Sequence, residues 1–148
     1  MNIEIKVDTA KFDKLLADLP AALARAQRNA LEAIGSEVKS QAERAFRHPQ
    51  YRPSPWAPRK NNADPERPLL YKSGSLRQSI GWKLVGGDTV VVGTDREYAG
   101  YHQFGTKHMP ARPFFPVDKR GNLLPRVLRK IVGLVEDALS DALRKIGG

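Results

Sequence analysis

YAGYHQFGTKHMPARPFFP, residues 98–116, concentrates aromatic residues, glycines and prolines more densely than any other stretch of the chain. Gly100 and Gly105 let the backbone turn tightly, whereas Pro110, Pro113 and Pro116 prevent a continuous helix. The stretch therefore predicts an aromatic turn followed by a rigid extended run. Because aromatic rings bury large apolar areas, we expect this segment to anchor the fold. The expected core anchors are Tyr98, Phe104, Phe114 and Phe115.

Arg112 lies within this rigid run. A residue that precedes a proline is pushed toward extended geometry, so Pro113 should hold the Arg112 guanidinium in one direction. We expect this group to pair with a carboxylate, either in its own domain or in a neighbouring subunit, in a way that lysine could not reproduce.

Length and composition indicate one soluble-type domain over residues 1–148. A chain of 148 residues can bury a sufficient core on its own, and 41% hydrophobic with 28% charged residues argues against both membrane and disordered classes. The absence of cysteine excludes disulfides and thiolate metal sites and fits a reducing cytoplasm. The first residues also lack the pattern of a signal peptide, and we expect no membrane segment.

The chain is basic, with a net charge of +9. Residues 44–77 carry eight basic against two acidic residues, a net charge of +6. Such a region either aids solubility or contacts a polyanion, so a nucleic-acid-binding module is the alternative functional class.

The first half of the chain predicts a strand followed by helix. Residues 2–7 alternate apolar and polar side chains, which indicates a half-buried strand. Helical spacing follows and meets Pro20, which predicts either one kinked helix or two joined helices. Up to Ala45 the apolar stripe consists mostly of small residues, which favour close packing.

Residues 48–68 contain six of the eleven prolines and show no periodic pattern. We expect a flexible loop within the domain, mobile in the free subunit and ordered in an assembly. Trp56 suits a partner's pocket or its own domain, and Arg59 and Lys60 are candidate contacts with an acidic rim.

The second half predicts a short helix, a hairpin and a long helix. Leu76 and Ile80 have helical spacing, and the alternating residues 80–85 and the β-branched run 89–92 flank a Gly-Gly-Asp turn. Residues 123–146 form the clearest amphipathic helix. The predicted fold is α+β, with a small antiparallel sheet formed by residues 2–7, the Trp82 hairpin and the Phe114 run. Long N-terminal and C-terminal helices should cover this sheet, beside a Pro-rich basic loop.

No catalytic signature occurs in the sequence. There is no phosphate-binding glycine loop, HExxH or GxSxG motif, and the three histidines lack metal-ligand spacing. We therefore expect no catalytic residue, cofactor or metal, and a protein that is not an enzyme.

Trp-Ala-Pro at residue 56 is followed in succession by LLYKSGSLRQSI, by the valine hairpin with YHQFGT, and by MPARPFFPV before an amphipathic helix. This succession of motifs resembles the phage virion morphogenesis family of tail-completion and neck proteins. Ser73 stands where the family often has threonine. The positions that match the family pattern are Leu70, Gly74, Leu76, Tyr98, His102, Phe104, Gly105, Pro110, Ala111, Arg112, Pro113 and Phe114.

The resemblance implies a structural protein of long-tailed phages and prophages that helps to connect head and tail. Its expected partners are phage tail or neck proteins and further copies of itself in a ring, with non-specific DNA contact as an additional expectation. Its expected location is the virion, after assembly in the bacterial cytoplasm.

Overall fold

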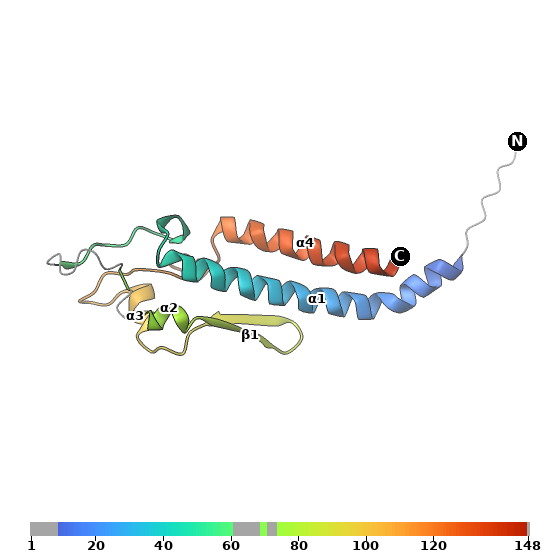
Figure 1. Ribbon diagram of the computed structural model, residues 1–148, viewed down its shortest axis with the longest axis horizontal. Helices are drawn as coiled ribbons and strands as arrows, with labels where there is room; N and C mark the ends of the chain where they lie inside the picture. The colour runs from blue at the N-terminus through green and yellow to red at the C-terminus, as the bar shows by residue number, and fades with distance from the viewer. Residues whose placement is uncertain (1–8, 61–68, 71–73, 148) are drawn as a thin grey trace, which may run out of the picture.

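A computed structural model describes residues 9–60, 69–70 and 74–147 of the chain. Figure 1 shows an elongated molecule with one long central helix. In chain order the elements are α1 (Thr9–Ala45), the 3-10 helix η1 (Pro49–Tyr51), α2 (Ser75–Gln78), β1 (Gly81–Val85), β2 (Thr89–Gly93), α3 (Ala99–Phe104) and α4 (Pro125–Gly147). The α+β class predicted from the sequence is confirmed.

Helix α1 is one continuous helix of 37 residues with Pro20 inside it. Figure 1 shows it bending in its N-terminal third, as expected where a proline removes a backbone hydrogen bond. The small residues of the stripe predicted from the sequence are buried, including Ala26, Ala30 and Ala42. Side chains of this size let other elements approach α1 closely.

The molecule has three layers, with α1 in the middle (Figure 1). Helix α4 runs antiparallel along one side of α1, and the hairpin lies along the other side. A Cβ atom at Gly35 would come within 2.7 Å of the Trp82 ring and 2.9 Å of Val90, so glycine is what permits this hairpin contact. Our expectation that both long helices cover the sheet is wrong for α4, because its apolar side meets the small-residue stripe of α1.

The hairpin of β1 and β2 is confirmed, with Trp82 opposite Val92 and Leu84 opposite Val90. Gly86 takes the left-handed conformation at φ +64°, as the tight turn requires. Among the described residues the sheet has these two strands alone. The strand predicted over residues 2–7 lies outside the described residues.

The run around Phe114 was expected to be a third strand, and this is wrong. Pro113 and Pro116 have no N–H to donate to a neighbouring strand, and the N–H groups of Phe114 and Phe115 donate to the Gln103 side chain. The run is instead pinned to α3. Phe114 belongs to a core cluster at the C-terminal end of α1, together with Ala42, Ala45, Phe46, Trp56, Leu76, Ile80 and Ala99.

Candidate assembly interface

Gln103 on α3 organises the 98–116 segment. Its side-chain oxygen accepts hydrogen bonds from the N–H groups of Phe114 and Phe115, each 3.0 Å long, and its nitrogen donates to the Phe115 carbonyl at 3.4 Å. The residue is only 8% exposed. The buried amide thus provides hydrogen-bond partners for backbone groups of Phe114 and Phe115, in a run that the prolines prevent from joining a sheet.

Gly105 makes the sharp turn after α3. Its φ is +75°, and an added Cβ would lie 2.8 Å from the Ala111 backbone nitrogen. This close approach brings the extended run back along α3, where the Arg112 N–H donates to the His102 carbonyl at 2.6 Å. Gly105 therefore fits the predicted role of a turn residue.

Arg112 binds backbone carbonyls. Its Nε donates to the Ala57 carbonyl at 2.9 Å and its Nη2 to the Pro58 carbonyl at 3.0 Å. The carboxylate pair expected from the sequence is not formed with any described residue. Partial burial, with a smaller effect of the Arg59 charge, lowers the Arg112 pKa. Arg112 is thus a cross-link between the loop around Ala57 and the 98–116 segment.

Trp56 is a core residue of its own domain. Its ring lies edge-on to Phe46 at a centroid distance of 6.0 Å, and its Nε1 donates to the Pro113 carbonyl at 2.8 Å. Arg52 stacks 3.8 Å from the ring and donates to the Ala45 carbonyl at 2.6 Å. The proposal that Trp56 docks into a partner is wrong, because this residue is 8% exposed in the single chain.

The loop predicted to be flexible over residues 48–68 is only partly described. Up to residue 60 it is held by η1 and by the contacts of Arg52, Trp56 and Arg112, which contradicts mobility of this part. Arg59 is half-buried and Lys60 is exposed. Residues 61–68 lie outside the described part of the chain.

The aromatic residues of the 98–116 segment divide into two groups. Phe114 is fully buried, as predicted, and Phe115 packs against the core cluster. Phe104 is 69% exposed and Tyr98 is 40% exposed, so their assignment as core anchors is wrong. On the single turn-and-a-half of α3, Ala99 and Gln103 take the buried side and leave Phe104 facing outward.

His102 has a partly buried imidazole beside Tyr98, with a ring-centroid distance of 6.0 Å. Burial lowers the pKa of His102, and the nearby charge of Arg112 lowers it further by a smaller amount. Its buried Nδ1 has no hydrogen-bond partner among the described residues.

The remaining predicted positions are structural or exposed. Gly74 adopts φ +70° at the N-cap of α2, where a residue with a side chain would be strained, and Leu76 is 4% exposed. Pro113 is buried and Pro110 is exposed.

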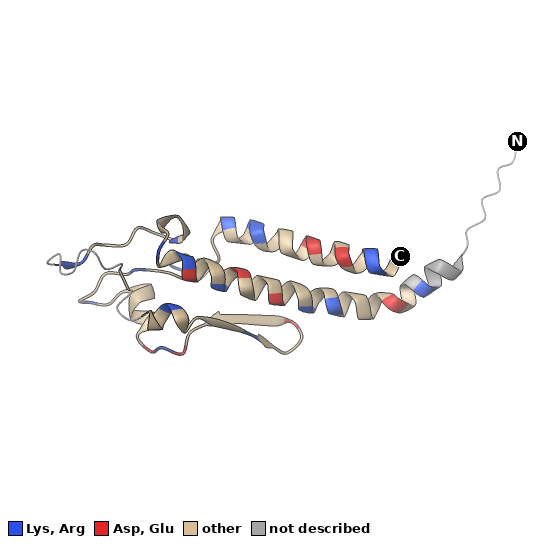
Figure 2. Cartoon of the chain, in the orientation of Figure 1, with Lys and Arg blue, Asp and Glu red and all other residues tan. Residues whose placement is uncertain are grey.

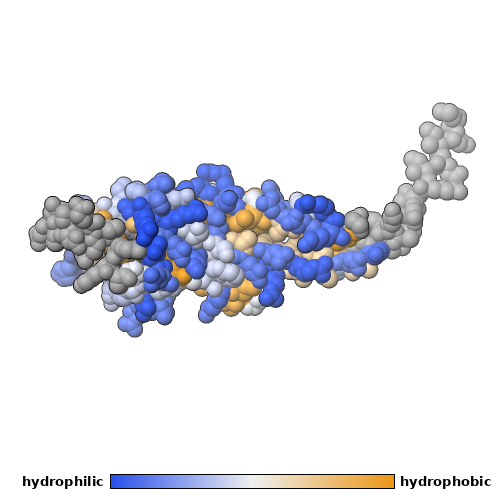
Figure 3. All heavy atoms as spheres, viewed as in Figure 1, coloured by the Kyte–Doolittle hydropathy of each residue, from blue (hydrophilic) through white to orange (hydrophobic). Residues whose placement is uncertain are grey.

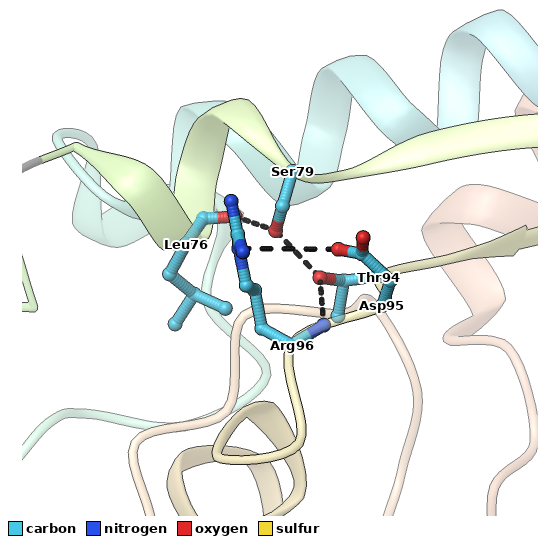
Figure 4. Close-up of polar contacts among 5 residues, drawn as sticks. All are labelled: Leu76, Ser79, Thr94, Asp95 and Arg96. Carbon is cyan, nitrogen blue, oxygen red and sulfur yellow. Dashed lines mark hydrogen bonds and ion pairs between the residues drawn. The ribbon is translucent and has the colours of Figure 1, made fainter.

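A small polar cluster joins α2 to the end of β2 (Figure 4). The Ser79 hydroxyl donates to the Leu76 carbonyl at 2.6 Å and lies 2.5 Å from the Thr94 hydroxyl. Thr94 in turn accepts from the Arg96 N–H at 3.1 Å. These contacts fix the turn that carries the chain from β2 to α3.

Two residues that sequence reasoning missed join α4 to the rest of the molecule. Arg126 donates to the Gln41 side chain and to the Tyr51 carbonyl, both at 2.8 Å. Gln41 lies in the buried stripe of α1, and a polar residue at such a position was the available signal. Gln103 offered a similar signal within YHQFGT.

Helix α4 exposes part of its apolar face. Val127 is fully buried against the body, whereas the side chains on the neighbouring stripe are 40–54% exposed. We call this set the α4 stripe; its members are Leu128, Val132, Leu139 and Leu143. Figure 3 shows apolar side chains gathering along α4 and over the hairpin within a largely polar face. The α4 stripe and the exposed Phe104 are the candidate interface.

The candidate interface consists of apolar side chains bordered by charged residues. Among the described residues there is no cluster of His, Cys, Asp or Glu that could hold a metal ion. In the same part of the chain, no helix has the length and apolar character to cross a membrane.

Comparison with known proteins identifies the class. The model of the phage virion morphogenesis family matches residues 7–140, and the chain belongs to this family. It is also similar to the Mu-like prophage FluMu G protein 1 of Haemophilus influenzae, with 28% identity over 137 residues that cover 82% of this chain and 88% of the relative. No solved structure matches the chain significantly. The protein therefore has a structural role in phage morphogenesis and is associated with the virion.

Proposed function

We propose that this protein acts at the head-proximal end of the phage tail, in tail completion or head–tail joining, as a ring of identical subunits. The observation that carries the proposal is the α4 stripe, because four large apolar side chains stay 40–54% exposed along one face of a helix. Exposed apolar surface of this kind marks protein–protein contact. Membership of the family supplies the phage context.

The charge on α4 supports a contact with a protein surface. Basic residues lie at both ends of the helix and acidic residues between them, as Figure 2 shows. Alternating charge beside an apolar stripe orients a partner and disfavours wrong registers. A partner that contacts α4 would therefore be selected by both shape and charge.

Binding to nucleic acid is less well supported by the structure. Arg52 lies in the Pro-rich loop, and Arg112 contacts this loop from the 98–116 segment. Both direct their guanidinium groups to backbone carbonyls. Arg126 does the same at the start of α4. Several cations of this chain thus stabilise loops, which leaves fewer for phosphate contact.

The test is induction of a prophage that lacks this gene. We expect electron micrographs of the lysate to show filled heads and separate tails, and purified protein added to the lysate to restore plaque-forming particles. Normal particles from the deletion strain, or a lysate without tails or heads, would contradict the proposal.

A pair of charge-matched variants tests the α4 stripe. Val132→Lys with Leu143→Lys should remain folded, since these side chains are 54% and 52% exposed, and should lower the number of restored plaques at least about tenfold because two apolar contacts are lost. Asp137→Asn with Ser140→Lys changes the charge of the same helix by the same amount outside the stripe and should restore plaques normally.

A further inference from the structure

A hollow of about 620 Å³ lies beside the outer edge of β2. Val90 and Val92 of β2, Ile34 and Val38 of α1, Phe104 of α3 and Leu123 are among its lining residues. No described residue donates to or accepts from the backbone of this edge beyond its pairing with β1. An open edge beside an apolar hollow can accept one further strand.

The sheet itself favours a third strand. Two strands alone are marginal, and here only one face of the hairpin is covered, by α1. A strand added next to β2 would place alternate side chains in the hollow, over Ile34 and Val38. The added segment should therefore be about five or six residues long with apolar residues at every second position.

The chain contains one such segment in residues 2–7. Ile3, Ile5 and Val7 alternate with Asn2, Glu4 and Lys6, and the segment is as long as β2 requires. These residues lie outside the described structure. Their sequence shows the apolar–polar alternation that a strand beside the hollow requires.

The geometry of α1 prevents this segment from filling the hollow of its own chain. From Thr9 to Ile34 the helix advances about 37 Å at 1.5 Å per residue. If residues 2–7 paired with β2, only Asp8 would be left to bridge that span, and one extended residue covers about 3.5 Å. The hollow of the same subunit is therefore out of reach.

The N-terminal part of α1 projects away from the body. Ala22 faces Lys145 near the end of α4, so the helix before it extends beyond α4 (Figure 1). In this overhang the described side chains are exposed, apart from a half-buried Leu19, and Leu16 is 51% exposed. An apolar residue on a projecting helix also suits contact with a second copy.

We propose that residues 2–7 of one subunit add as a strand to the β2 edge of the next subunit. The contact is head-to-tail, because the arm and the hollow are different surfaces, so it closes into a ring if the rotation permits. This inference deepens the proposed function, on whose ring it rests, by naming the interface between copies. The overhang of α1 sets the distance between neighbours.

Single-cysteine chains test the exchange directly, because the natural sequence has no cysteine. Ile3→Cys, Ile5→Cys and Val7→Cys proteins are each mixed with Val92→Cys protein under mild oxidation, which samples the registers that a strand could adopt. We expect a disulfide-linked heterodimer for at least one mixture. Lys6→Cys, on the opposite face of the strand, should give little product.

The remaining outcomes overturn the proposal. They are no heterodimer in any mixture, linkage of an arm-cysteine protein mainly to itself, or linkage of Val92→Cys protein mainly to itself. An internal disulfide in a monomer that carries both cysteines would likewise show that the arm folds back.

Point variants separate this inference from the proposed function. Ile5→Asp should weaken self-association by about tenfold or more in light scattering, whereas Glu4→Gln on the polar face should not. A chain lacking residues 2–7 should remain folded and self-associate at least about tenfold more weakly than the full chain. If that chain oligomerises and restores plaques as the full chain does, the arm exchange is wrong while the function stands; if the full chain fails to restore plaques, the function itself is wrong.

Discussion

The Trp56 Nε1 donates a 2.8 Å hydrogen bond to the carbonyl of Pro113, 57 residues further along the chain. This bond joins the Pro-rich loop to the 98–116 segment inside the core. It explains why a tryptophan lies in a polar, proline-rich stretch: the indole supplies apolar volume and one donor for a buried carbonyl.

Trp56→Phe should therefore destabilise the protein. The phenyl ring retains much of the packing on Phe46 but leaves the Pro113 carbonyl without its donor, which costs about 1–3 kcal/mol. Urea unfolding followed by far-UV circular dichroism measures the change. Tyr101→Phe, at a residue 57% exposed, is the control and should change stability little; equal stability of both variants would contradict the assigned role.

Arg112→Lys should also lower stability, by about 1–3 kcal/mol, because an ammonium cannot reproduce the forked donation to the carbonyls of Ala57 and Pro58. The same unfolding experiment applies, with Arg129→Lys at an exposed position of α4 as the matched change. If Arg112→Lys is indistinguishable from the natural chain in both stability and assembly, the two hydrogen bonds of Arg112 contribute to neither property.

Phe114 and Phe104 should respond in opposite ways to truncation. Phe114→Ala removes a fully buried ring and should cost about 3–5 kcal/mol, whereas Phe104→Ala removes a ring that is 69% exposed and should cost well under 1 kcal/mol. Thermal melting of the two variants gives the comparison. A large loss of stability in Phe104→Ala would place that ring in the core.

Two glycine-to-alanine changes in helices test the contact between α1 and the hairpin. At Gly35 the added methyl meets Trp82 and Val90 below 3.0 Å, so Gly35→Ala should destabilise by about 1–3 kcal/mol. At Gly133 the space is open, and Gly133→Ala should stabilise α4 by up to about 1 kcal/mol. Stabilisation by both changes would show that the hairpin does not lie as closely on α1 as described.

The sequence predicted the elements better than their arrangement. The periodicities of residues 9–45 and 123–146 and the Gly-Gly-Asp turn depend on local chemistry, so both long helices and the hairpin are confirmed. Where α4 packs is decided by the small side chains of α1, such as Ala26 and Ala30, which are compatible with either a helix or a sheet as neighbour. Periodicity alone could not decide between them.

The candidate site was predicted less well. Aromatic residues in a dense stretch were all assigned to the core, but the six residues of α3 can bury only one side, and Ala99 and Gln103 take it. Arg112 found carbonyls in place of a carboxylate because a proline-rich loop leaves many carbonyls unpaired. The α4 stripe was predicted as apolar, but its exposure depends on how much of the face α1 covers.

The most direct test of the central claim is the position of this protein in the finished particle. A gold-binding tag fused after Gly148, at the end of α4, should be introduced into the phage and located by electron microscopy of purified virions. We predict that the label lies at the junction of head and tail. Label along the tail tube or at its distal tip, or its absence from infectious particles, would contradict the account.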